Sequence, residues 1–155
     1  MTRTSLKHFH CSMARTADII GDKWTLLILR DAFFGGTTFS QFQKSLGVAR
    51  NILSDRLEKL VEHDVLEKTP VRPGVERYHY QLTERGRDLV PVLIAITQWG
   101  DRWIFGEGNE PFQFFDKAGG EPILPVEVQS RSGKALTADD ITASHRSDQD
   151  SNAKR

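Results

Sequence analysis

The chain has 155 residues, enough for one domain with a real core, and its 21 Lys and Arg balance its 21 Asp and Glu. Zero net charge decides nothing about partners, so a nucleic-acid contact has to be inferred from local charge. The chain lacks a long apolar run, and its basic N-terminus lacks the apolar segment of a signal peptide. We therefore expect a cytoplasmic protein with no membrane contact, and its single cysteine excludes an intrachain disulfide.

Residues 1–12 are expected to form a flexible arm, since they contain basic residues and no acid. Cys11 lies beside His8 and His10 and one helical turn from Arg15. Nearby cations stabilise the thiolate, which is the reactive form of cysteine. Cys11 is therefore a candidate redox sensor, and the alternative is a passive cysteine packed at a helix start. His8, His10 and Cys11 are of the types that bind metals, but two or three such residues in one flexible arm are too weak a pattern to predict a metal site.

Two helices are predicted after the arm. The first covers residues 14–20 and ends at Gly21, and Asp22 can cap the second, which covers residues 23–34. The second helix is apolar on nearly every side, which is typical of a buried helix. Residues 37–39 are expected to add a short strand to the ribbon that comes later in the chain.

Residues 39–46 and 49–63 predict two further helices joined by a turn at Gly47, with Ser40 as the N-cap of the shorter one. The longer helix carries one narrow apolar stripe and is otherwise polar. This is the layout of a helix-turn-helix, whose second helix lies in the DNA major groove. The stripe consists of Leu53, Leu57, Leu60 and Val61.

Charge is sorted along this unit. Residues 44–56 carry a net charge of +2 and residues 57–69 a net charge of −2. A DNA duplex is a polyanion, so it would attract the first half and repel the second. The alternative interpretation is the ordinary solvated face of an amphipathic helix.

Residues 65–71 and 76–82 alternate as strands do, and Pro-Gly between them is a strong turn signal. Arg72 and Arg77 flank the tip of this ribbon. A helix-turn-helix followed by such a hairpin is a winged helix, and arginine suits contacts to phosphates or to a minor groove. The predicted fold is thus mainly α with a small β-wing.

Thr83 is expected to cap a long helix that reaches about residue 105, with a kink at Pro91 because the proline ring clashes with the carbonyl of Arg87. This helix has more apolar surface than one small domain can cover, which indicates a homodimer formed through the N- and C-terminal helices. The alternative is that it only closes the monomer core. The predicted interface side chains are Ile19, Leu93, Ile96, Trp99 and Trp103.

The winged-helix and dimerisation domain is accordingly assigned to residues 13–105. Residues 106–129 are expected to form a small β-hairpin extension. Residues 130–155 are polar and rich in Ser, Asp and Thr, so they are predicted to be a disordered tail.

Five motifs follow one another along the chain: Cys11, the run 21–31 (GDKWTLLILRD), 39–42 (FSQF), 53–57 (LSDRL) and 82–87 (LTERGR). In this order they resemble the HxlR-type regulators, which are bacterial winged-helix transcription factors distantly similar to the MarR group. The resemblance covers roughly residues 9 to 105 and implies a homodimer that binds a pseudo-palindromic operator. In several such proteins a cysteine at the position of Cys11 senses oxidants or electrophiles. Two residues depart from the family pattern. Many relatives have Ser or Thr at the position of Ala49 and Gly at the position of Asp64.

The predicted function is sequence-specific binding of double-stranded DNA as a homodimeric repressor, with an oxidant response through Cys11. Arg50, Asn51 and Ser54 are expected to face base edges, with Asp55 as a further base contact. The alternatives are a regulator of the same fold that responds to a small molecule, and a winged helix used as a protein-interaction module. The sequence has no phosphate-binding loop, metal-binding histidine pair or nucleophile elbow, so we predict no enzyme and no cofactor. The side chains expected at phosphates or the minor groove are Arg56, Arg72 and Arg77.

Overall fold

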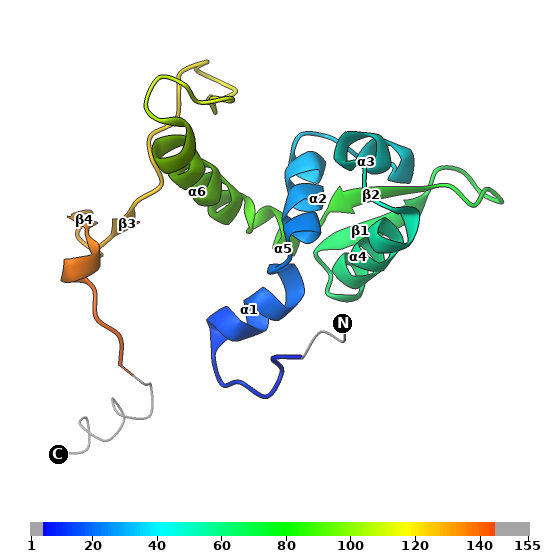
Figure 1. Ribbon diagram of the computed structural model, residues 1–155, viewed down its shortest axis with the longest axis horizontal. Helices are drawn as coiled ribbons and strands as arrows, with labels where there is room; N and C mark the ends of the chain where they lie inside the picture. The colour runs from blue at the N-terminus through cyan, green and yellow to red at the C-terminus, as the bar shows by residue number, and fades with distance from the viewer. Residues whose placement is uncertain (1–4, 145–155) are drawn as a thin grey trace. The chain divides into compact units, whose positions relative to one another are not determined.

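The computed structural model describes residues 5–144 and contains six α-helices and four strands there (Figure 1). The chain divides into a unit that ends at Thr97 and a second unit that starts at Gln98. In the described part, no helix is both long and apolar enough to cross a membrane. The elements are α1 (Ser12–Ile20), α2 (Lys23–Phe33), α3 (Phe39–Leu46), α4 (Arg50–Glu62), β1 (Leu66–Pro70), β2 (Tyr78–Leu82), α5 (Glu84–Arg87), α6 (Val90–Gly100), a π-helical turn (Asp101–Phe105), β3 (Val128–Gln129), β4 (Ala135–Leu136) and a 3₁₀ turn (Ala138–Asp140).

Side-chain caps set the starts of α2 and α3. Asp22 accepts hydrogen bonds from the backbone N–H groups of Trp24 and Thr25, as predicted. The predicted cap of α3 was wrong, because Thr38 and not Ser40 accepts the first-turn hydrogen bond. Thr38 and Gln41 form a reciprocal capping box, which satisfies two first-turn donors at once, and this combination defines the helix start.

Left-handed backbone conformations occur where α3 ends and directly after α4. Gly47, with φ 61°, ends α3. Ala49 is the N-cap residue of α4 and forms no side-chain cap, because its methyl group cannot accept a hydrogen bond. Asp64 has φ 55° and is the one non-glycine residue with positive φ in the described part of the chain. Thr83 holds this turn, because its hydroxyl donates to the carbonyl oxygen of Asp64 over 2.6 Å.

The wing is an antiparallel pair of strands, with Leu66 opposite Leu82 and Pro70 opposite Tyr78. In Figure 1 its loop reaches beyond α3 and α4. The expected third strand is present as one bridge, between Thr38 and His79, and the N–H of Tyr80 donates to the carbonyl of Thr37 over 2.7 Å. The ribbon is therefore tied to the segment that leads into α3.

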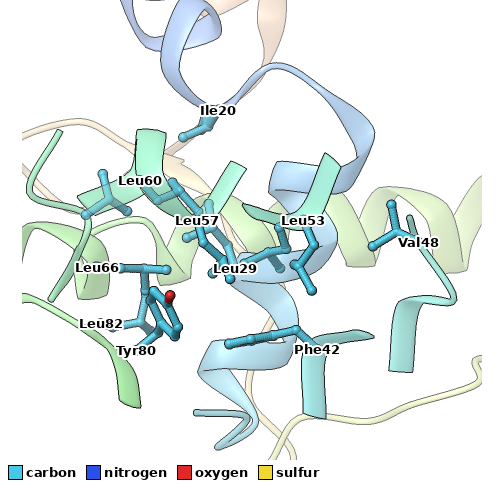
Figure 2. Close-up of a cluster of buried hydrophobic side chains, with 12 residues drawn as sticks. Ile20, Leu29, Phe42, Val48, Leu53, Leu57, Leu60, Leu66, Tyr80 and Leu82 are labelled. Atoms are coloured by element: carbon cyan, nitrogen blue, oxygen red, sulfur yellow. The ribbon is translucent and has the colours of Figure 1, made fainter. Parts of the chain in front are cut away.

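One hydrophobic core joins α2, α3, α4 and the wing (Figure 2). The apolar stripe predicted for α4 supplies three fully buried leucines, each worth about 1.5–3 kcal/mol in burial. The prediction that α2 is buried is confirmed in part, because Ile28 and Leu29 are fully buried whereas Phe33 at its C-terminal end is exposed. The largest fully buried side chains are Phe42, Ile28, Leu29, Leu53, Leu57, Leu60 and Leu66.

The predicted long helix is interrupted before Pro91. The short α5 ends at Arg87 and α6 starts at Val90, so two helices stand where one kinked helix was predicted. The clash of a proline ring with the preceding turn is strong enough to end a helix and not only to bend it. At Gly86 a Cβ atom would lie 2.2 Å from the carbonyl oxygen of Val65. Only glycine therefore allows α5 to approach the start of the wing this closely.

The second unit has little regular pairing. Between residues 106 and 129 the expected hairpin amounts to one bridge, between Phe115 and Pro122. A regular pair forms further on, between β3 and β4, and the 3₁₀ turn is stabilised by a capping box of Thr137 and Asp140. Residues 130–144 belong to the tail that composition predicts to be disordered, and the structure places β4 and the 3₁₀ turn there. Residues 1–4 of the predicted arm and 145–155 of the predicted tail lie outside the described residues.

Candidate nucleic-acid interface

The first turn of α4 places its polar side chains in solvent. Arg50 and Asn51 are exposed, and Ser54 is half-buried one turn later, where its hydroxyl donates to Oε1 of Glu58 over 3.3 Å. Residues 50, 51 and 54 share one side of a helix because of the 3.6-residue repeat. Asp55 is exposed and ion-paired with Arg56. The predicted base-reading residues are therefore together on one accessible surface.

Arg50 is held in place by two side chains of α3. Its guanidinium donates to Oε1 of Gln43 over 3.2 Å and lies 4.9 Å above the ring centre of Phe39. Both contacts restrict a long side chain that would otherwise lose rotamer freedom on binding. Sequence reasoning missed Phe39 and Gln43 as supports. The only available signal was that Gln43 and Arg50 flank the turn at Gly47.

Arg56 lies differently from the expectation that it faces a phosphate. Its Nε is 3.1 Å from Oδ1 of Asp22, and the two side chains are only 20% and 17% exposed. The Nε–H is not aligned for a hydrogen bond, so this contact is an ion pair. The carboxylate that caps α2 draws Arg56 toward α2, and little of its side chain remains accessible to DNA.

The wing presents its basic residues as expected. Arg72 and Arg77 are exposed at the two ends of the tip loop, which is closed by a hydrogen bond of 2.8 Å from the N–H of Val71 to the carbonyl of Arg77. A third exposed cation was missed by sequence reasoning. Lys68 on β1 lies with its Nζ 4.2 Å from the ring centre of Tyr78 on β2, which directs it along the ribbon.

Cys11 is exposed and is the N-cap residue of α1, although its side chain caps no N–H group. Arg15, one turn on, donates to the carbonyl of Lys7 over 3.1 Å and so ties the arm to α1. Lys7, His10 and Arg15 line the same cleft as Cys11. Within residues 5–144, no three His, Cys, Asp or Glu side chains are grouped so that they could hold a metal ion.

The residues predicted for a dimer interface separate into two groups. Ile19 and Leu93 pack partly against the core of the first unit. Ile96, Trp99 and Trp103 are exposed, the two tryptophans by 61% and 66%. No residue of α6 is buried although its sequence is strongly apolar, which leaves a large apolar surface in solvent.

A helix-turn-helix with a basic first turn, followed by an arginine-tipped wing, defines a winged helix-turn-helix protein of the DNA-binding class. The HxlR-like helix-turn-helix family matches residues 19–107, and the chain belongs to this family of transcriptional regulators. An uncharacterized HTH-type transcriptional regulator of Mycobacterium tuberculosis is 37% identical over 131 residues, which cover 84% of this chain and 83% of the relative.

Two solved structures agree with this assignment. The candidate transcription factor PA1607 is 42% identical and superimposes with a TM-score of 0.83, covering 91% of this chain and 99% of its own. The oxidized form of the redox regulator HypR is 27% identical with a TM-score of 0.53, covering 59% of this chain and 95% of its own. PA1607 thus matches the second unit as well, whereas HypR covers little more than half of this chain.

Proposed function

We propose that the protein is a homodimeric repressor that binds a pseudo-palindromic operator. The observation that carries this proposal is the position of Arg50, exposed at the start of α4 and held there by Gln43 and Phe39. An arginine fixed at this end of a recognition helix can donate two hydrogen bonds to O6 and N7 of one guanine. Arg72 and Arg77 would contact phosphates or the minor groove beside it.

The exposed apolar surface at Ile96, Trp99 and Trp103 supports the dimer. A two-fold dimer would place two α4 helices roughly 34 Å apart, one turn of DNA, so that two half-sites are read together. A dimer bound across a promoter excludes the polymerase, which makes repression the simplest outcome of binding. Arg56 is not among the proposed DNA contacts, because its ion pair with Asp22 holds α4 against α2.

We also propose that oxidants act through Cys11. The thiol is exposed one helical turn before Arg15, and the relative HypR is named as a redox regulator. A single thiol per chain can form a mixed disulfide with a small thiol or pair with the partner's Cys11. Pairing requires Cα atoms within about 7 Å, so it would occur only if the two arms meet at the two-fold axis.

The experiment is a DNA titration of the full chain by fluorescence anisotropy. The operator is first selected from genomic fragments and is then titrated between 50 and 200 mM salt. Six to ten phosphate contacts would weaken binding by about 10³–10⁵ over this range through counterion release. Binding with a shallow salt dependence would contradict the proposal and would favour the protein-interaction module instead.

A further inference from the structure

A cleft of about 490 Å³ opens beside α1, away from the proposed DNA surface on the first turn of α4. The arm forms one wall and α1 another, and the C-terminal end of α4 and the short α5 close it. The side chains that matter for its chemistry are Lys7, Phe9, Arg15, Ile19, His63 and Arg85.

The lining of the cleft is basic. Lys7, Arg15 and Arg85 supply three basic side chains from three different segments, against one carboxylate at Asp18. That carboxylate already accepts a hydrogen bond of 3.1 Å from the hydroxyl of Ser5. Cys11 and Ser12 at the open N-terminus of α1 also line the cleft, and the side chain of Cys11 caps none of the first backbone N–H groups. Cations and uncapped helix N–H groups together favour an anion.

We propose that this cleft binds a small organic carboxylate with an apolar body. Arginines at positions 15 and 85 would hold the carboxylate through paired hydrogen bonds. The ring of Phe9, which is about half exposed, and the side chain of Ile19 provide the apolar part of the lining. The cleft thus places two apolar side chains beside its cations, a lining that suits an anion carrying an apolar group.

The cleft is mechanically connected to the proposed recognition helix. Asp18 lines it, and the backbone carbonyl of Asp18 accepts a hydrogen bond from Nζ of Lys59 on α4. His63, the C-cap residue of α4, lines it as well. A ligand that shifts α1 or the end of α4 would therefore reposition α4, and this part of the inference rests on the proposed DNA-binding function. An effect on DNA binding requires unequal affinity of the ligand for the two arrangements.

The first test measures binding to the full chain without DNA, by calorimetry, with 2-naphthoate as probe. The neutral 2-naphthamide has nearly the same shape and serves as the matched ligand. We expect a Kd for 2-naphthoate below about 1 mM and binding of the amide at least about tenfold weaker. Absence of 2-naphthoate binding at millimolar concentration, or equal binding of the two, would overturn the proposal.

The second test locates the site. Arg85→Gln should raise the Kd for 2-naphthoate about tenfold, because it removes one charge-assisted donor. Arg87→Gln is the matched control, since Arg87 is exposed on the same short helix and does not line the cleft. Equal effects of the two variants, or no effect of either, would place any bound naphthoate elsewhere and overturn the assignment.

The third test repeats the operator titration with saturating 2-naphthoate. We expect the parent to change its DNA affinity at least about threefold, and Arg85→Gln to change far less at the same ligand concentration. An unchanged DNA affinity in the parent would overturn the coupling to α4. Failure of the DNA-binding proposal would be recognised separately, as absence of operator binding without ligand.

Discussion

Nε of Arg56 lies 3.1 Å from Oδ1 of Asp22, and this ion pair joins α4, the proposed recognition helix, to the start of α2. The same carboxylate accepts the first N–H groups of α2, so one side chain fixes both the start of a core helix and the position of α4. Lys59 makes a second connection between α4 and the chain just before this point. Residues 18–22 are therefore a fixed support for the helix that we propose reads DNA.

Asp22→Ala should lower the free energy of unfolding by about 1–3 kcal/mol, because it removes the cap of α2 and the partner of Arg56. Urea unfolding measures the change. Asp55→Ala is the control, since Asp55 pairs with Arg56 from the solvent side and should shift stability by less than about 1 kcal/mol. In a double-mutant cycle, Asp22→Ala and Arg56→Ala should couple by at least about 0.5 kcal/mol, and strict additivity would contradict the ion pair.

Arg50→Ala should weaken operator binding by about 1–3 kcal/mol and relax the preference at one symmetric operator position. Gln43→Ala should affect the same position more weakly, because it leaves Arg50 present but less well held. Arg72→Ala should instead weaken all sequences alike and reduce the salt slope by about 1. Anisotropy titrations with operator variants distinguish these patterns, and a change in sequence preference from Arg72→Ala alone would reverse the assignment.

Asp64→Gly should raise the free energy of unfolding by up to about 1 kcal/mol, because glycine adopts the left-handed conformation without steric cost. Gly47→Ala should lower it by about 1–2 kcal/mol for the opposite reason. Urea unfolding of the parent and the two variants under the same conditions measures both changes in the free energy of unfolding. A destabilising Asp64→Gly would mean that the aspartate side chain has a contact that outweighs its backbone strain.

The dimer proposal predicts that Trp99→Glu combined with Trp103→Glu gives a folded monomer at micromolar concentration. Burying two charges in an apolar interface is costly, whereas both side chains are solvent-exposed in the single chain. Light scattering gives the mass, and circular dichroism checks the fold. Val71→Glu, an exposed apolar position on the wing, is the control and should remain dimeric. A monomeric parent protein would refute the dimer directly.

Cys11→Ser should bind the operator like the parent under reducing conditions and should lose the response to diamide or peroxide. The serine hydroxyl is close in size but does not form the oxidised products of a thiol. Binding is titrated before and after oxidant, and mass spectrometry identifies the product at Cys11 in the parent. If parent and Cys11→Ser lose binding equally, or neither responds, the oxidant proposal fails and a ligand such as the proposed carboxylate becomes the better effector.

Much of the first unit was predictable because its signals are local. The stripe of Leu53, Leu57 and Leu60, the turn at Gly47 and the break before Pro91 follow from periodicity and backbone sterics. The Asp22–Arg56 ion pair was not predictable, because it depends on the angle at which α4 crosses α2. The contacts of Gln43 and Phe39 with Arg50 were not predictable for a similar reason, because they depend on how α3 packs against α4. In the second unit, the capped turn of Thr137 and Asp140 lies in a stretch with the composition of a disordered segment, so composition could not predict the turn.

The most direct test of the account is selection of genomic fragments by the parent protein and by Arg50→Ala, followed by sequencing of the bound DNA. The parent should enrich a pseudo-palindrome with half-sites about 10 base pairs apart, and the variant should enrich the same sequence with one symmetric position relaxed. No enrichment by the folded parent, or an identical sequence preference for both proteins, would contradict the claim that α4 reads the operator through Arg50.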